Sequence, residues 1–147
     1  MNIVISQQGK KLIFWGALLF LIGLMQGALI PYFTNPRMAL SAHLTAVQSG
    51  MAVIIFGLLW ELLSVPEKWK NLAYYANIVG MYLVWFAITL AAIVGASRAL
   101  PIAGSGYSSS NINETLVEII VMAGSGFIVL STVIIVFGLY KRLLSNA

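Results

Sequence analysis

The side chains that could carry out chemistry in this sequence are few. The chain has one histidine, His43, four acidic residues, all of them glutamate, and no cysteine. The histidine and the glutamates do not have the spacing of a zinc site, which needs three or four protein ligands. No serine has an adjacent base as in a catalytic triad, and no glycine-rich loop follows a strand. Without cysteine, disulfides, thiolate chemistry and iron–sulfur clusters are excluded.

One kind of chemistry stays open to a single imidazole. A haem supplies four nitrogen ligands itself and needs only one axial ligand from the protein. The opposite face of its iron is then available as a Lewis acid. The alternative is that His43 is a structural residue whose hydrogen bonds are satisfied inside the protein, which is the commoner role of a lone buried histidine. The residues by themselves leave both readings open.

Composition places these side chains in a membrane protein. Hydrophobic residues make up 61% of the chain and charged residues 8%, whereas soluble proteins carry about 25% charge. The charged residues leave four long uncharged segments, and a helix that crosses a bilayer needs about 20 apolar residues. The segments are unbroken rather than alternating, which favours helices over a barrel. The sequence therefore predicts one all-α membrane domain, 1–147, with four transmembrane helices at about 12–34, 41–64, 71–97 and 114–141.

The cations predict the orientation of these helices. The side opposite both termini carries only Arg37 and Arg98. The other six of the eight cations lie on the side of the termini: Lys10, Lys11, Lys68, Lys70, Lys141 and Arg142. The positive-inside rule then predicts a multi-pass protein of a bacterial-type inner membrane with both termini in the cytoplasm. This distribution explains the net charge of +4 without a nucleic-acid partner.

Two helix ends resemble each other, which suggests an internal repeat. The segment AVIIFGLLWELLS (52–64) and the segment TVIIVFGLYKRLLS (132–145) both place Phe-Gly-Leu near the predicted cytoplasmic exit of a helix. Internal repeats are common in membrane folds. The pattern favours two helical hairpins in parallel repeat, and the alternative is a chance similarity of two apolar helix ends.

Two loops lie on the opposite side: 31–42 contains Pro31 and Pro36, and 98–113 contains Pro101, two glycines and four serines. Proline opposes helix continuation, so both loops are predicted to be non-helical. Ser41 and Asn113 are the expected N-caps of the helices that follow, because their side chains can accept hydrogen bonds from the first turn.

Polar residues inside the spans are functional candidates, because they are costly in lipid and are expected to face the protein interior. The candidates are Gln26, His43, Gln48, Ser49, Tyr75, Asn77, Tyr82 and Glu118. The alternative is that they hold helices together through hydrogen bonds, which we favour for Gln26 and Ser49. Trp60 and Tyr74 are predicted to lie in the aromatic belt at the membrane surface.

The segment around the histidine resembles a known family. The run NPRMALSAHLTAVQSGM (35–51), followed by FGLLW, is similar to the corresponding region of hydroxylaminobenzene mutases. The runs YANIVG, ALPIAGSG and ETLVE extend this resemblance along nearly the whole chain. A fainter similarity, centred on Ala42-His43 and Gly50-Met51, reaches the styrene oxide isomerases, which are also small four-span proteins.

The resemblance implies roles for several residues. The epoxide isomerases use ferric haem b, and their axial histidine on the second helix corresponds to His43. Their asparagine shortly after this ligand falls at about Ser49, so Gln48 or Asn77 is expected to replace it. The tyrosine of that family corresponds to either of two residues of this chain, Tyr75 and Tyr82.

The residues and the resemblance together predict a membrane-embedded isomerase. The mutases convert an aryl hydroxylamine to a 2-aminophenol, and we expect the same reaction here, with haem b as the Lewis acid. The alternatives are an aryl epoxide isomerase that yields an aldehyde, and a non-catalytic scaffold or small transporter. Either reaction is a redox-neutral rearrangement of a small aromatic substrate. Resemblance to the epoxide isomerases favours a homotrimer.

Two contacts are expected if His43 binds haem. The propionates would need cations, and Arg37 and Arg98 are the only cations predicted on that side, with guanidinium groups that bind carboxylates as a fork. The second nitrogen of the imidazole should hydrogen-bond to a carbonyl or polar side chain. Gln48 lies about 140° around the helix from His43, so this partner is expected to come from another helix.

Overall fold

Helices account for most of residues 5–145, the part of the chain that this computed structural model describes, and no strand occurs among them. The helices are α1 (Gln7–Leu29), η1 (Ile30–Tyr32), α2 (Pro36–Leu59), η2 (Trp60–Leu62), α3 (Glu67–Val94), α4 (Pro101–Gly104) and α5 (Asn111–Ser145). Here η marks a one-turn 3-10 helix. Within this part of the chain, four segments are long and apolar enough to cross a membrane: α1 with η1, α2 with η2, α3 and α5. The predicted all-α membrane fold with four transmembrane helices is therefore confirmed.

Helix α2 begins earlier than predicted, because its cap precedes the proline rather than following it. The side chain of Asn35 accepts a hydrogen bond from the Met38 N–H at 3.1 Å. Pro36 takes the first helical position, where its missing N–H costs nothing and its fixed φ suits the helix. Ser41, the predicted cap, lies inside α2, where its hydroxyl bonds to a backbone carbonyl one turn earlier.

The predicted boundaries around the second loop also need correction. The loop 98–113 is not wholly non-helical, because α4 begins at Pro101 within it. Helix α5 then begins at Asn111, and the Ser110 hydroxyl accepts from the Asn113 N–H at 3.4 Å. Asn113 is therefore inside the helix, and the cap is supplied by a residue before it.

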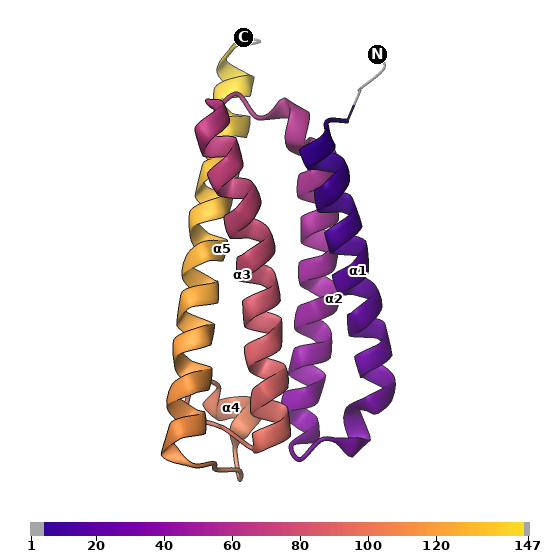
Figure 1. Cartoon of the computed structure of the whole chain (residues 1–147), viewed down its shortest axis with the longest axis vertical. Coiled ribbons are helices and arrows are strands. Elements are labelled where there is room, and N and C mark those ends of the chain that lie inside the picture. The colour runs from indigo at the N-terminus through magenta and orange to yellow at the C-terminus, as the bar shows by residue number, and fades with distance from the viewer. Residues whose placement is uncertain (1–4, 146–147) are drawn as a thin grey trace.

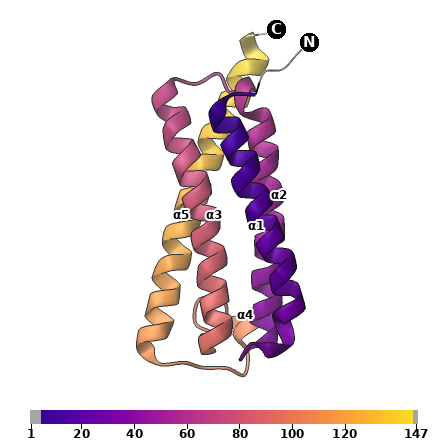
Figure 2. The ribbon, with the colours of Figure 1, turned by 45° about the vertical axis from the view of Figure 1, so that its right-hand side comes forward.

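The long helices form two antiparallel hairpins. Helix α1 packs mainly on α2, and α3 packs mainly on α5, while α2 and α3 join the two pairs. Figures 1 and 2 show that α1 begins and α5 ends at the same end of the bundle, with α4 at the opposite end. Helix α3 therefore occupies the centre of the arrangement, in contact with both of the helices beside it.

Glycine pairs bring the backbones of each hairpin close together. A Cβ atom at Gly16 would lie 2.7 Å from the Gly50 carbonyl oxygen, and one at Gly50 would lie 2.7 Å from the Gly16 oxygen. In the second hairpin, a Cβ atom at Gly80 would lie 2.9 Å from the Gly124 oxygen. Such small-residue contacts are a principal way in which membrane helices pack. Both hairpins thus depend on the absence of side chains at their crossing points.

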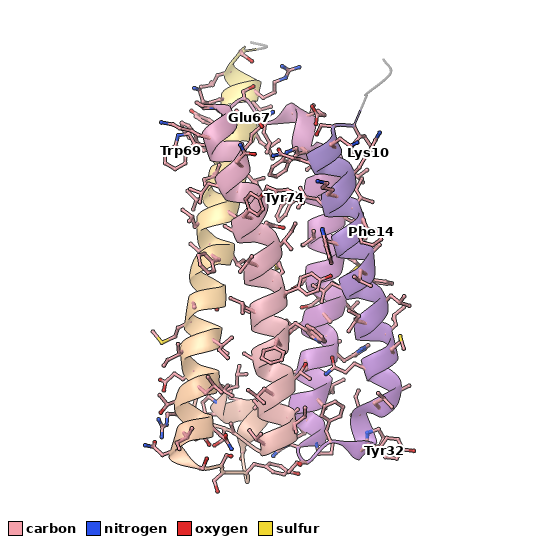
Figure 3. The ribbon with its side chains drawn as sticks, viewed as in Figure 1. Lys10, Phe14, Tyr32, Glu67, Trp69 and Tyr74 are labelled. Atoms are coloured by element: carbon pink, nitrogen blue, oxygen red, sulfur yellow. The ribbon has the colours of Figure 1, made fainter. Side chains whose placement is uncertain are left out.

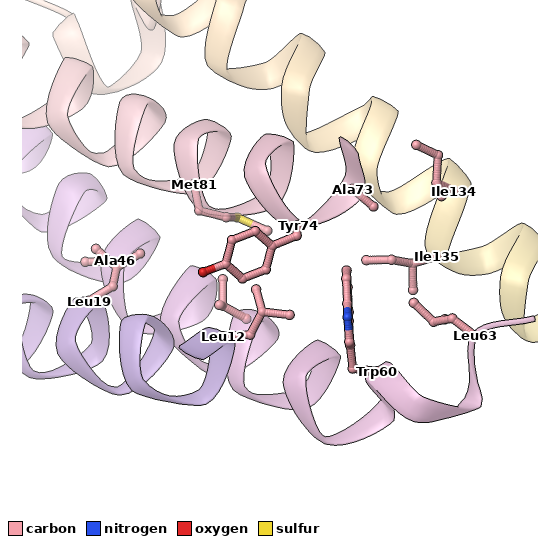
Figure 4. Packing of buried hydrophobic residues seen from close by; sticks show 11 residues of the cluster. Leu12, Leu19, Ala46, Trp60, Leu63, Ala73, Tyr74, Met81, Ile134 and Ile135 are labelled. Carbon is pink, nitrogen blue, oxygen red and sulfur yellow. The ribbon is translucent and has the colours of Figure 1, made fainter. Parts of the chain in front are cut away.

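Trp60 and Tyr74 lie in the core and not in the aromatic belt. They are 1% and 7% exposed, and their rings meet edge to face at 6.4 Å between centroids. Figure 3 shows Tyr74 directed into the bundle, whereas Trp69 points away from it. Figure 4 shows the pair packed beside Leu12 and Ile135. The indole N–H of Trp60 donates to the Gln8 side chain at 2.9 Å, so its polar edge is satisfied within the protein.

Candidate active site

The ring of His43 is held by the backbone of α1. Its Nδ1 atom lies 2.7 Å from the carbonyl oxygen of Gly23. A carbonyl oxygen carries no proton, so Nδ1 is the donor of this hydrogen bond, and in a neutral imidazole Nε2 then keeps its lone pair. This is the contact expected of a metal-binding histidine, and its partner comes from another helix, as predicted. The Gly23 carbonyl therefore orients the imidazole and selects the tautomer of its neutral form.

Gly27 makes room for this ring on α1. A Cβ atom at position 27 would lie 3.0 Å from both Cε1 and Nδ1 of His43 and 3.5 Å from Nε2. Gly23 and Gly27 are one helical turn apart, so together they form a niche for the imidazole. His43 stays partly exposed, and within residues 5–145 its Nε2 makes no hydrogen bond. An imidazole that is oriented in this way and has an unpaired second nitrogen fits the requirement of an axial haem ligand.

Gln26 links the same turn of α1 to α3. Its side chain is buried, its Nε2 donates to the Thr89 hydroxyl at 3.0 Å, and its Oε1 accepts from the Trp85 indole N–H at 2.8 Å. Gln26 thus hydrogen-bonds across helices, as we interpreted it from the sequence. Because Gly27 follows it directly, this turn of α1 contacts His43 on one side and α3 on the other.

An apolar groove of about 430 Å³ lies between α1 and α3. It is lined by Trp15, Ile78, Val79, Tyr82, Leu83, Trp85 and Phe86. The Tyr82 ring meets Trp15 and Trp85 edge to face, with centroids 6.1 and 6.3 Å apart. The Tyr82 hydroxyl donates to the Trp15 carbonyl at 2.8 Å. These contacts fix the aromatic side chains, so the groove is preformed.

The remaining polar candidates do not converge on His43. Gln48 is exposed and makes no hydrogen bond within the described part of the chain. Asn77 is fully buried between α3 and α5, where its Nδ2 donates to the Ser131 hydroxyl at 3.3 Å and its Oδ1 has no partner among the described residues. Tyr75 is 65% exposed. No hydrogen bond or ring contact of residues 5–145 joins any of the three to the imidazole.

Arg37 lies at the same end of α2 as His43, on a second groove. This groove has a volume of about 570 Å³, and its lining residues are Arg37, Leu40, Ser41, Ala99, Leu100, Pro101, Ile102 and Ala103. The Arg37 guanidinium donates to the backbone carbonyl of Ser105. Its side chain is exposed, so the contact uses a carbonyl and leaves the positive charge without a counterion among the described residues.

Arg98 is tied to the first turns of α5. Its Nη2 donates to the Asn111 side chain at 2.7 Å, and its Nη1 lies 3.7 Å from an oxygen of Glu118. Both charged side chains of this pair are well exposed. Glu118 lies in the second turn of α5 and is the counterion of Arg98. The two arginines predicted to act together thus have different surroundings.

Sequence reasoning missed Glu114, which organises the second loop. Its buried carboxylate accepts backbone N–H bonds from Ser97 at 3.0 Å, Arg98 at 2.8 Å and Ser109 at 3.2 Å. An Asn-x-x-Glu run at 111–114 is a signal for a helix start and could have drawn attention to this residue. Its carboxylate joins both ends of the loop and fixes the backbone of Arg98.

Comparisons with known proteins identify the family of this chain. The family model described as styrene oxide isomerase matches residues 8–140. The chain is 34% identical to hydroxylaminobenzene mutase HabA of Ectopseudomonas oleovorans over 127 residues, which cover 86% of this chain and 94% of that protein. It is 38% identical to hydroxylaminobenzene mutase HabB of the same organism over 109 residues, 74% of this chain and 66% of that protein. No solved structure matches. The chain is thus an enzyme, an intramolecular isomerase of the hydroxylaminobenzene mutase type, and it belongs to the styrene oxide isomerase family.

Proposed function

We propose that this enzyme rearranges an aryl hydroxylamine to a 2-aminophenol inside the membrane, with haem b held by His43. The observation that carries the proposal is the contact between His43 Nδ1 and the Gly23 carbonyl, which leaves Nε2 free to bind iron. The names of the two mutase relatives support the choice of substrate.

The proposed reaction requires few reactive side chains from the protein itself. In the rearrangement an N–O bond breaks, a C–O bond forms at a ring carbon, and one proton leaves that carbon while another reaches the oxygen or nitrogen. All atoms and electrons are conserved, so neither a nicotinamide nor an external oxidant is required. A bound ferric haem would supply the electrophile that weakens the N–O bond. The protein has to orient the ligand histidine and hold the aromatic ring away from water.

The residues around His43 suit the first task, and the aromatic groove suits the second. Gly23 accepts from Nδ1 and Gly27 leaves space for the ring, so the imidazole is already oriented with Nε2 unpaired. The groove between α1 and α3 presents Trp15, Tyr82 and Trp85 to a small aromatic molecule. Aromatic faces also attract developing positive charge. We propose that this groove receives the substrate from the bilayer.

The arginines at the outer end of the bundle would hold the haem propionates. Arg37 suits this role because its guanidinium contacts only a backbone carbonyl among the described residues and can pair with a carboxylate. Arg98 already has Glu118 as a partner at 3.7 Å, but exposed pairs of this kind are weak and can be exchanged. We therefore propose Arg37 as the main anchor and Arg98 as a second one.

Gln48 supports an oligomeric enzyme. It lies near the middle of α2, exposed and without a hydrogen-bond partner in residues 5–145, and an amide facing lipid is costly. A second copy of the chain packed on this face would satisfy it. We propose a homo-oligomer, with a trimer as the first expectation, and we place the enzyme in a bacterial inner membrane with both termini in the cytoplasm. Gln48 and Asn77 remain our candidates for the polar group that assists the reaction, with Tyr75 and Tyr82 as the candidate tyrosines.

Isomerisation of an aryl epoxide to an aldehyde is the second candidate function. The specific observation in its favour is the description of the family model, styrene oxide isomerase, which matches residues 8–140. That reaction would need the same electrophile and the same apolar groove. It differs in breaking a C–O bond of the epoxide, with a hydrogen shift that gives the aldehyde.

One assay separates the two candidates. Purified enzyme is incubated with phenylhydroxylamine and, separately, with styrene oxide, and the products are identified by chromatography. We expect 2-aminophenol from the first substrate and little aldehyde from the second, and we expect His43→Ala to abolish turnover. Formation of phenylacetaldehyde alone would make the epoxide isomerase the correct assignment.

A further inference from the structure

A third groove lies at the opposite end of the bundle from the His43 site. Its volume is about 410 Å³, and it is lined by Val65, Pro66, Trp69, Val133, Ile134, Phe137 and Lys141. It is formed by the segment that leads into α3 and by the last third of α5. Its body is apolar, while its rim lies at the end where most of the cations of the chain occur. The groove thus combines an apolar wall with a positively charged opening.

Two lysines hold their ammonium groups beside aromatic rings of this groove: Lys141, which lines the groove itself, and Lys68, whose neighbour Trp69 lines it. The Nζ atom of Lys141 lies 5.8 Å from the centroid of Phe137, and that of Lys68 lies 5.9 Å from the centroid of Trp69. Both lysines are exposed, and within residues 5–145 no carboxylate lies within 4.0 Å of either one. Trp69 is 43% exposed and points away from the bundle (Figure 3), as an indole at the membrane surface does.

The walls of the groove are fixed by contacts between its two segments. The Ser64 N–H donates to the Gly138 carbonyl at 3.1 Å. A Cβ atom at Gly138 would lie 3.3 Å from Leu63 and 3.4 Å from Val65, so the segment before α3 packs closely on α5. The groove therefore exists before any ligand arrives, which lowers the cost of ordering on binding.

We propose that this groove is a binding site for one phospholipid with an anionic headgroup, taken from the leaflet at this end of the bundle. An acyl chain would lie against Val133 and Phe137, and the headgroup would lie between Lys68 and Lys141. Any lipid can cover apolar helix surface, but only an anionic one gains from two unpaired ammonium groups. Basic pockets between transmembrane helices bind anionic headgroups in this way. The site is separate from the proposed reaction and does not depend on it.

Native mass spectrometry of the full-length protein tests this site directly. The protein is titrated with phosphatidylglycerol and with phosphatidylcholine of the same acyl chains, and bound lipid is counted per chain. We expect one phosphatidylglycerol to remain bound at voltages that remove phosphatidylcholine. In the double variant Lys68→Gln/Lys141→Gln its affinity should fall about 25-fold, because each lysine near a membrane surface strengthens binding roughly fivefold.

Two further variants distinguish this site from general electrostatic attraction. Lys10→Gln/Lys11→Gln removes the same charge at the same end of the bundle, away from the groove, and should keep the tight lipid. Val133→Trp leaves both lysines in place and fills the groove, and it should lose the lipid. Equal loss in the two double-lysine variants, equal retention of both lipids by the unaltered protein, or full retention by Val133→Trp would overturn the proposal.

Discussion

Gly27 of α1 contacts the imidazole of His43 so closely that a Cβ atom at position 27 would lie 3.0 Å from Nδ1 and from Cε1. The same ring donates from Nδ1 to the Gly23 carbonyl at 2.7 Å. Two glycines one turn apart therefore set the position of the only histidine in the chain: Gly23 accepts its hydrogen bond, and Gly27 leaves space for its ring. The position of the proposed cofactor ligand therefore depends on the two glycines as well as on the histidine.

Gly27→Ala should therefore impair haem binding without preventing insertion. The added methyl group would push the ring away from the Gly23 carbonyl, and loss of such a supporting contact typically costs about 10- to 100-fold in metal affinity or activity. The measurements are the ratio of haem to protein after purification and the rate of 2-aminophenol formation. Gly126→Ala is the matched control, because a Cβ atom there would meet nothing within 4 Å. Equal haem content and equal rates in both variants would contradict the niche.

Glu114 and Glu118, two glutamates of α5, should differ in how much they contribute to the free energy of unfolding. Glu114→Gln replaces a buried carboxylate that accepts from the N–H groups of Ser97, Arg98 and Ser109, and it should lower the free energy of unfolding by roughly 2 kcal/mol. Glu118→Gln removes only an exposed pair at 3.7 Å and should cost less than about 1 kcal/mol. Unfolding in mixed micelles measures both. A larger loss from Glu118→Gln would show that the loop is not fixed by Glu114.

Much of the fold could be predicted because the bilayer imposes simple rules. Four uncharged segments were enough to predict four spans, since an apolar solvent leaves the backbone few alternatives to helix. The residues at which the helices begin and end could not be predicted from the uncharged segments. Asn35 caps α2 one residue before Pro36, and charge patterns do not report such polar caps. Trp60 was predicted at the membrane surface by residue type, whereas its ring is buried and its indole N–H donates to the Gln8 side chain.

The candidate site could be predicted only in part, because the hydrogen-bond partner of His43 is a backbone carbonyl. His43 stands out by composition, since it is the only imidazole of the chain. Its partner is the carbonyl of Gly23, and a main-chain oxygen leaves no trace in a sequence. The polar candidates Gln48 and Asn77 were chosen by residue type and lie on helix faces that do not meet the imidazole in a single chain. Glu114 was missed because its partners come from a distant turn of the chain.

The orientation of the bundle can be tested with single cysteines, because the chain has no native one. Ser108→Cys lies in an exposed part of the second loop, and Ser145→Cys lies at the end of α5 among exposed residues. The positive-inside rule predicts that an impermeant maleimide labels position 108 in intact cells and position 145 only after lysis. Labelling of position 145 alone in intact cells would invert the topology.

The arginines should affect haem content to different degrees. Arg37→Ala removes the guanidinium that lines the outer groove, and we expect the larger loss of bound haem from this change. Arg98→Ala should have a smaller effect, because Arg98 is already paired with Glu118. The double variant should bind the least haem. Haem per protein, measured as the pyridine haemochrome, gives the order of the three. Full haem content in the double variant would leave the arginines with a topological role only.

An absorbance spectrum of the purified enzyme shows whether His43 binds haem b, as we propose, through Nε2. We predict a Soret band in the unaltered protein that shifts when phenylhydroxylamine is added. His43→Ala should reach the membrane in the same amount, and it should lack both the Soret band and mutase activity. His43→Gly supplied with imidazole should recover part of both. A mutase that is active without a Soret band, or a His43→Ala variant that keeps its haem, would contradict the account.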